Sequence, residues 1–238
     1  MSRERFESVP QSSADHVPSP AEENVASEDG ALASLKNRDL PPEQIEQIIQ
    51  NSGLMKSRKV RLAVAAHPRA PRRLVLRLIR ELYTFDLMQF ALLPMAAADL
   101  KRVADELLVS RLASISLGER LSLARRSSAL VASALLLDKE SRVWQAALEN
   151  PRMTELAIVK ALQRSDPAPA FVHAVCRHAK WSLRPEIRMA LLRNAHTPMA
   201  RALEYARRIP PAKLRDILHA SRLPQKIKDY LRKQISGE

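Results

Sequence analysis

Apolar and polar positions along this chain follow the period of an α-helix over most of its length. From about Lys56 onward, apolar stripes recur in segments of roughly 9 to 14 residues, separated by short stretches rich in proline, serine and asparagine. Apolar residues three and four positions apart lie on one face of a helix. The pattern therefore predicts an all-α fold built from short helices. The composition agrees, because 4 glycines and 4% aromatic residues favour helices over sheets.

One nine-residue pattern recurs in altered form. A β-branched or aromatic residue comes first, alanine fourth, two apolar residues fifth and sixth, and histidine or asparagine eighth, with proline ninth in two copies. The clear copies are Val60–Pro68, Val143–Pro151, Phe171–Ala179 and Ile187–Ala195, and the weaker ones are Met88–Ala96 and Leu121–Ala129. Such self-similarity is typical of helical repeat proteins.

The pattern has a direct physical interpretation. Positions one, four, five and eight share one helix face, and the alanine allows a neighbouring helix to approach closely. Histidine or asparagine before proline predicts a helix end, since the residue before proline avoids the helical region. After the first copy, Pro71 is expected to open a second helix with Leu74, Val75, Leu78 and Ile79 as its apolar stripe. Each unit is thus a helix, a turn and another helix.

A single unit of this kind cannot bury its apolar face alone, so we expect the units to stack. The intervals between copies are irregular, which indicates a degenerate array. The predicted architecture is a right-handed α-solenoid of degenerate helical-hairpin repeats. A compact irregular helical bundle is the structural alternative.

Two regions are predicted along the chain. Residues 1–38 combine serine, proline and acidic residues with few large apolar ones, and are expected to form a disordered acidic tail. Residues 39–238 are expected to form the helical repeat domain. Its first helix should begin at Pro41 or Pro42, bury Ile45, Ile48 and Ile49, and end at Asn51–Gly53.

Charge divides in the same way. Residues 1–38 carry four basic and seven acidic groups, so the remaining 200 residues hold a net charge of +16. A domain this basic favours a polyanionic partner. The arginines after Pro71 lie opposite the apolar stripe, and stacked units would align such positions into a basic face. The residues predicted to form this partner-binding face are Arg72, Arg73, Arg77, Arg80, Arg125, Arg126, Arg207 and Arg208.

The first copy and the helix after it resemble the leucine-rich repeat variant family, bacterial helical repeats with an Arg-x-x-Val-Ala-x-(Asn/His)-Pro-x-(Thr/Ala)-Pro-x-x-Leu-x-x-Leu core. The matching residues are Arg61, Val64, Ala65, His67, Pro68, Pro71, Leu74 or Val75, and Leu78. Later copies match less well, since Trp144 replaces the arginine and Ala195 the first proline. More loosely, the chain is similar to HEAT-like repeat proteins. The resemblance covers about half of the chain and implies a solenoid with a binding surface and no catalytic residues. The cysteine cluster of some family members is absent from this sequence, so an iron–sulfur role has no support.

The sequence offers little local chemistry. His173, Cys176 and His178 are the best metal-ligand candidates, but Cys176 takes a position that is Ala65 in the first copy, which favours packing. His67 and His178 recur at one repeat position and are expected to cap helix ends. Asp105 and Glu106 are expected on a solvated face, and Asp138 in a loop. We expect no cofactor, no metal and no catalysis.

Trp144 and Trp181 raise one sharper alternative. Some HEAT-like proteins of similar length are DNA glycosylases for alkylated bases, with tryptophans and an aspartate in a basic groove. By that resemblance, Trp144 and Trp181 would stack on a nucleotide beside an aspartate such as Asp138. Packing is the favoured role for both indoles, because aromatic residues are scarce.

The sequence favours a non-enzymatic scaffold or binding module that engages an acidic protein surface. The alternative partner is nucleic acid, held through its phosphate backbone. We expect no membrane association, because neither a signal peptide nor a transmembrane run is present in this sequence. The single cysteine fits a reducing compartment, and we expect the protein in the cytoplasm.

Overall fold

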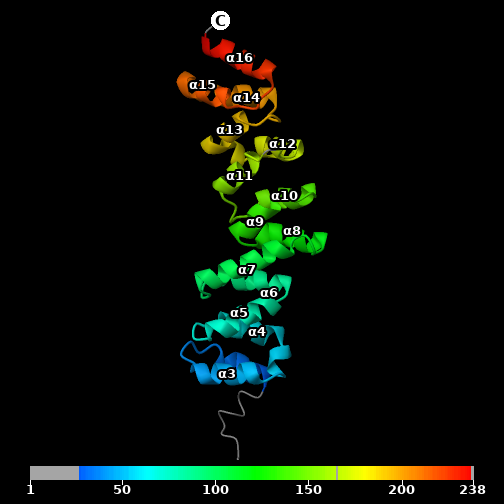
Figure 1. The fold of residues 1–238 in the computed structure, drawn as a ribbon, viewed down its shortest axis with the longest axis vertical. Coiled ribbons are helices and arrows are strands. Elements are labelled where there is room, and N and C mark those ends of the chain that lie inside the picture. Colours follow the sequence, from blue (N-terminus) through cyan, green and yellow to red (C-terminus); the bar gives the residue numbers. More distant parts are fainter. Residues whose placement is uncertain (1–26, 165, 237–238) are drawn as a thin grey trace, which may run out of the picture. The chain divides into compact units, whose positions relative to one another are not determined.

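The structure, a computed structural model, describes residues 27–164 and 166–236. Within these ranges every regular element is a helix: fifteen α-helices and two short 3-10 helices, with no strand (Figure 1). The all-α prediction is thereby confirmed. Residues 1–26, most of the predicted acidic tail, lie outside the described residues. In the described part of the chain, no helix has the length and apolar character needed to cross a membrane.

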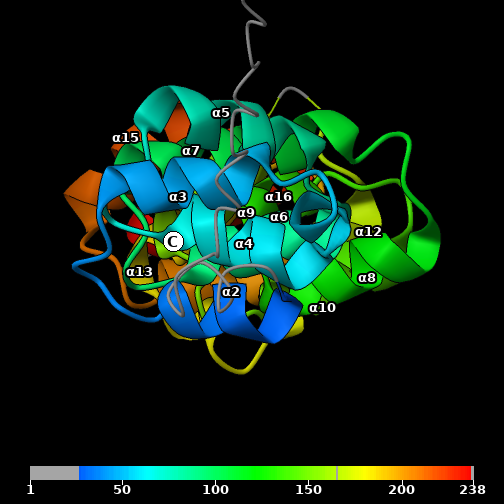
Figure 2. The same ribbon diagram turned by 90° about the horizontal axis from the view of Figure 1, so that it is seen from below.

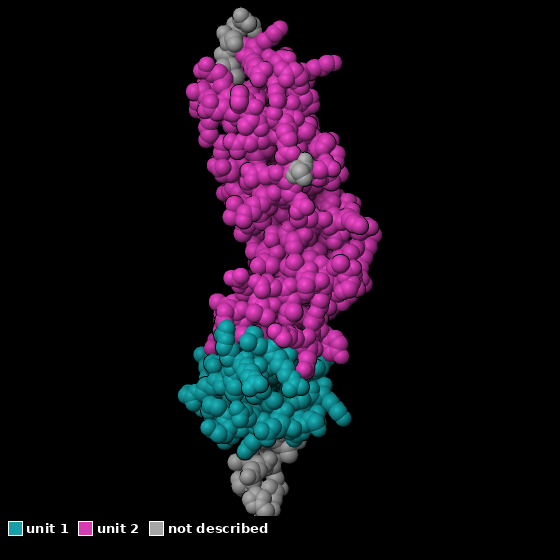
Figure 3. Space-filling view, viewed as in Figure 1, with its two compact units in different colours: residues 1–78 teal, residues 79–238 magenta. Residues whose placement is uncertain are grey.

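The chain divides into two compact units, and the boundary between them falls within residues 39–238. Unit 1 comprises the residues up to Leu78, and unit 2 those from Ile79 onward (Figure 3). The helices of unit 1 are α2 (Glu28–Ser34), α3 (Pro42–Gln50), the 3-10 helix η1 (Leu54–Lys56), α4 (Arg58–Ala66) and most of α5 (Arg72–Glu81). The helices of unit 2 are α6 (Thr84–Leu92), α7 (Ala98–Arg111), α8 (Leu117–Arg126), α9 (Ala129–Leu135), α10 (Ser141–Leu148), α11 (Glu155–Leu162), α12 (Pro169–Arg177), η2 (Trp181–Leu183), α13 (Pro185–Leu192), α14 (Met199–Ala206), α15 (Pro211–His219) and α16 (Gln225–Ser236).

Helix α2 corrects the predicted boundary of the tail at residue 38. Ser27 caps it by accepting a hydrogen bond from the Gly30 N–H at 3.1 Å, and Ala31 is fully buried. The composition of this stretch misled the prediction because it contains few large apolar residues. A small residue such as alanine suffices where α2 packs on α4.

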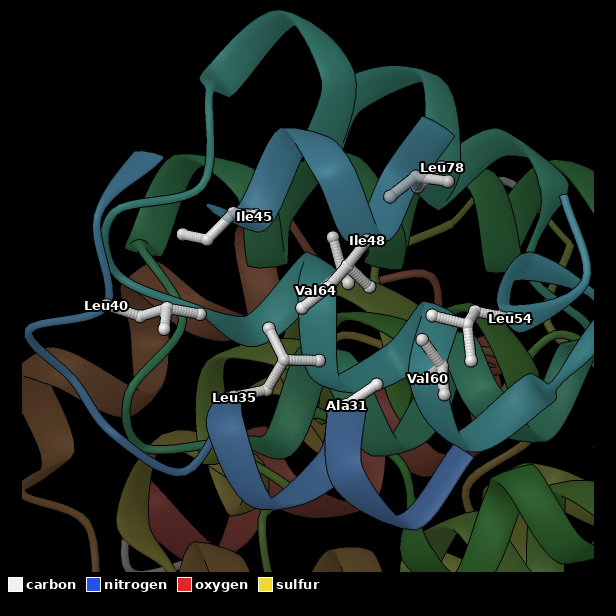
Figure 4. Close-up of a cluster of buried hydrophobic side chains, with 9 residues drawn as sticks. All are labelled: Ala31, Leu35, Leu40, Ile45, Ile48, Leu54, Val60, Val64 and Leu78. Atoms are coloured by element: carbon white, nitrogen blue, oxygen red, sulfur yellow. The ribbon is translucent and has the colours of Figure 1, made fainter. Parts of the chain in front are cut away.

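The core of unit 1 forms where α2, α3, η1 and α4 converge. Figure 2 shows α4 between α2 and α3. The side chains that meet there are Ala31, Leu35, Leu40, Ile45, Ile48, Leu54, Val60, Val64 and Leu78 (Figure 4). The predicted helix with Pro42 in its first turn and Ile45 and Ile48 on its buried side is confirmed. Its end is fixed by Asn51, whose Oδ1 accepts hydrogen bonds from the N–H groups of Gly53 and Leu54.

All six copies of the recurring pattern begin inside a helix and run past its end, in α4, α6, α8, α10, α12 and α13. In the four clear copies, positions one, five and six are buried. Position six is at most 3% exposed in each, whereas position four is only half-buried at Ala63 and Ala174. The alanine at position four was predicted to make the close contact, so this detail differs. These helices have neighbours on more than one side, because α10 packs on both α8 and α12.

The helices of unit 2 pack mainly on their sequence neighbours and on the next helix but one. Helix α7 contacts α6 and α9, α13 contacts α11 and α15, and α14 contacts α13 and α16. Short connections between apolar helices produce this local pattern.

Asp105 departs from the solvated face expected for it. Its side chain is buried in α7, while that of Glu106 is exposed and pairs with Arg102 at 2.8 Å. Burial raises the pKa of the Asp105 carboxyl, and the nearby Ser128 hydroxyl offsets part of this rise. The carboxylate is therefore destabilising to the fold at neutral pH.

We expect Asp105→Asn to raise the free energy of unfolding at pH 7 by about 1 kcal/mol, because it removes a buried charge. A pKa raised on folding means that the native chain loses stability as the pH climbs from the ordinary value of 3.8 through the raised one. The difference in free energy of unfolding between Asp105→Asn and the parent chain should therefore be smaller at pH 4 than at pH 7. Urea unfolding at both pH values measures it, with Glu106→Gln as the exposed control. A variant no more stable at pH 7 than the parent would contradict the prediction.

Candidate functional site

The arginines of α5 lie on one exposed face of that helix. Arg73, Arg77 and Arg80 follow one another at spacings of four and three residues and are exposed. Val75 and Ile79 on the opposite side are at most 1% exposed. A helix with this division presents its guanidinium groups outward while its apolar stripe packs inward.

Two details of α5 refine the prediction. Leu74, expected in the apolar stripe, is only half-buried, and Leu82 just beyond the helix takes its place in the core. The C-terminal carbonyls of Arg80 and Leu82 accept hydrogen bonds at 2.8 and 2.7 Å from the guanidinium of Arg111 in α7. Arg111 therefore fixes the end of the helix that carries the arginines.

The other predicted arginines are exposed at helix ends. Arg125 and Arg126 complete α8, and Arg207 and Arg208 directly follow α14. Helix α8 packs on α9 and α10, whereas α14 packs on α13 and α16. The two helices thus pack on different neighbours. That the two arginine pairs align into one face stays a prediction.

The histidine or asparagine at position eight stabilises the turn that follows its own helix. The Nδ1 atoms of His67 and His178 accept hydrogen bonds at 3.2 Å from the backbone N–H two residues later. The Oδ1 atoms of Asn150 and Asn194 accept equivalent bonds at 2.8 and 3.0 Å. An imidazole Nδ1 and an amide Oδ1 accept the same turn hydrogen bond, which explains why two different side chains can alternate at one position.

In three of these side chains, a nitrogen atom also contacts a segment earlier in the chain. The His67 Nε2 lies 2.9 Å from the Asn37 carbonyl, and Asn150 donates to the carbonyls of Ala124 and Ser127 at 2.8 and 3.3 Å. Asn194 donates to Leu162 at 2.9 Å. Each of these carbonyls lies at or beyond the end of an earlier helix, where no intrahelical donor remains. One side chain therefore links the turn after its own helix to the end of an earlier helix.

His178 uses its second nitrogen differently. Its Nε2 lies 3.1 Å from the Glu149 carboxylate rather than a backbone carbonyl. Nearby His173 directs its own Nε2 to the His196 carbonyl at 3.1 Å, and Cys176 is buried. Burial raises the pKa of the Cys176 thiol to about 11, so it stays protonated at neutral pH. The described residues contain no group of three or more potential ligands placed to hold a metal ion.

Both tryptophans are buried, which agrees with the packing role favoured for them. Trp181 is 2% exposed and donates from Nε1 to the Leu148 carbonyl at 2.9 Å. Trp144 is 5% exposed and meets Phe171 edge to face, with ring centroids 5.6 Å apart. Trp144 and Asp138 line a hollow of about 280 Å³, but Trp181 does not. The convergence of both indoles with an aspartate in one groove, which the glycosylase hypothesis requires, is therefore not observed.

Both carboxylate oxygens of Asp138 have partners within the fold. One carboxylate oxygen lies 3.2 Å from Arg120 Nε, and the other accepts from the Glu140 N–H at 2.9 Å. Asp138 lies, as predicted, in the loop between α9 and α10. Its ion pair with Arg120 gives it a structural role there.

Sequence reasoning missed an apolar groove in unit 2. Its volume is about 500 Å³, and it is walled by α7, α9 and α11. Three leucines along it are strongly exposed, Leu130 at 42%, Leu137 at 48% and Leu156 at 61%. The usable signal was the stretch from 129 to 137, which contains no charged residue. A helical stretch apolar on all sides indicates burial against a further element.

No protein-family model matches this chain, and comparison with curated proteins and with solved structures also finds no match.

Proposed function

We propose that this chain is a non-enzymatic binding module, a right-handed α-solenoid of helical-hairpin repeats that engages an acidic protein surface. The observation that carries the proposal is the face of α5, where Arg73, Arg77 and Arg80 are exposed opposite a buried stripe. A row of guanidinium groups matches carboxylates in geometry and charge. We place the protein in the cytoplasm, where its single cysteine stays reduced.

The repeat interpretation is supported by the caps. His67, Asn150 and Asn194 stand at one position of the recurring pattern, and each bonds a carbonyl between 23 and 32 residues earlier. This span matches the length of a helical hairpin. The leucine-rich repeat variant and HEAT-like families are the resemblance that fits it.

A protein partner is favoured over nucleic acid by the apolar surface. Exposed leucines accompany the basic side chains of unit 2, and a phosphate backbone offers them no apolar counterpart. Nucleic acid held through its backbone would instead depend on charge alone, with affinity falling steeply as salt rises.

The test is affinity purification of the tagged chain from its own cells, with and without nuclease. We expect the bound protein to persist after nuclease and to fall about tenfold for a chain carrying R73E, R125E and R207E, because charge reversal repels an acidic surface. Arg142→Glu, an exposed arginine outside the predicted face, is the matched control. Loss of all bound material after nuclease would favour nucleic acid instead.

A further inference from the structure

The groove between α9 and α11 leaves an unusually apolar surface uncovered. Helix α9 buries Val131, Ala132 and Leu135 on one side. Its other side carries Leu130, Ser133 and Ala134, with Leu137 just beyond, at the three- and four-residue spacing of a second helical stripe. Two apolar stripes on one short helix indicate two packing partners, and one of them is the rest of unit 2.

The groove also interrupts the packing order of the helices. In the series α7, α9, α11, α13 and α15, each helix packs closely on the next, except that α9 and α11 do not. The groove lies between these two helices and is walled by both. It therefore lies where the direct packing of alternate helices is interrupted.

The lining specifies the chemistry of an occupant. Leu130, Leu137 and Leu156 supply exposed apolar contacts, while Ala134, Ala157 and Ala161 are small enough to let a backbone approach closely. Among the described residues of the lining, the charged ones are Lys160 and Arg164. They stand one helical turn apart on and just after α11, and both are exposed. One rim of an apolar groove is thus positively charged.

We propose that this groove binds an amphipathic α-helix of a partner protein, whose leucine-like side chains face α9 and whose acidic residues face Lys160 and Arg164. A helix laid in a groove presents apolar residues at three- and four-residue spacing, which suits exposed leucines on both walls. The acidic flank sets orientation and specificity more than affinity. This surface contains none of the predicted arginines, so the proposal stands apart from the basic face.

The test uses the full chain and two synthetic helical peptides of equal length. Both carry leucine at positions i, i+3, i+4 and i+7, and they differ only in bearing glutamate or lysine along one flank. In fluorescence anisotropy we expect the glutamate peptide to bind, and the lysine peptide to bind about tenfold more weakly. The double variant K160E and R164E should reverse this order, because both rim charges change sign.

The apolar contribution is tested with L130Q and L156Q together, which should abolish binding of the glutamate peptide. Both side chains are exposed, so the substitutions leave the fold intact. Leu183→Gln is the matched control, since Leu183 is 63% exposed in the same unit and lies outside the groove.

Three results would overturn the proposal: no binding of the glutamate peptide, equal binding of both peptides, or unchanged binding by the L130Q and L156Q chain. A fourth contradicting result would come from sedimentation velocity of the chain alone. If the parent self-associates and the leucine variant is monomeric, a second copy of this chain covers the groove instead.

Discussion

Trp181→Ala should lower the free energy of unfolding by about 3 to 5 kcal/mol, the largest loss expected for any single change described. The indole is 2% exposed, so truncation leaves a large cavity within unit 2. It also strips the Leu148 carbonyl, at the end of α10, of the hydrogen bond it accepts from Nε1 at 2.9 Å. Urea unfolding followed by circular dichroism measures the loss.

Trp181→Phe separates these two contributions. Phenylalanine fills part of the space of the indole but lacks the N–H donor. Beyond the cost of the smaller ring, we expect a loss of about 1 to 2 kcal/mol in the free energy of unfolding from the unsatisfied buried carbonyl of Leu148. Trp144→Phe is the matched control, because Trp144 is similarly buried but its contact with Phe171 is between rings. Equal losses for the two phenylalanine variants would show that the Leu148 hydrogen bond contributes nothing.

Asn150→Ala should cost about 2 to 3 kcal/mol, because it removes three hydrogen bonds from a side chain that is 1% exposed. The carbonyls of Ala124 and Ser127 and the N–H of Arg152 all lose their asparagine partner. The cost exceeds that of an ordinary surface cap, since these groups are shielded from water. Thermal and urea unfolding both measure it.

Asn150→His is the informative partner of this variant. His67 performs the same two tasks with an imidazole, accepting from Arg69 N–H and reaching the Asn37 carbonyl. Histidine at position 150 should therefore recover more than half of the stability lost on alanine substitution. If histidine is as destabilising as alanine, the two residues are not interchangeable at this position, and the shared-cap interpretation fails.

The sequence contained the local structure of this chain because helix formation is decided over short distances. The spacing of Ile45 and Ile48 identified α3, and His67 before Pro68 identified the end of α4, where the cap residue is extended at φ −71° and ψ 130°. These features depend on residues within one or two turns of each other. No knowledge of distant neighbours was needed.

Long-range features escaped prediction for the converse reason. Asp105 is polar and stands beside Glu106, yet it is buried where α7 packs on α6 and α9, near Ser128, which lies 23 residues further along the chain. The groove escaped because whether Leu130 is covered depends on where α11 lies, which no local pattern encodes. The same holds for the arginine pairs at the ends of α8 and α14. The local sequence predicts that each side chain is exposed, but whether the two pairs align depends on how distant helices pack.

The caps give the chain a direction. Each donor comes later in the sequence than the carbonyl it satisfies: His67 serves Asn37, Asn150 serves Ala124, and Ser221 serves Leu192 at 2.7 Å. In these three cases the carbonyl is satisfied by a segment that follows it in the sequence. During synthesis, these three carbonyls therefore leave the ribosome before the side chains that satisfy them.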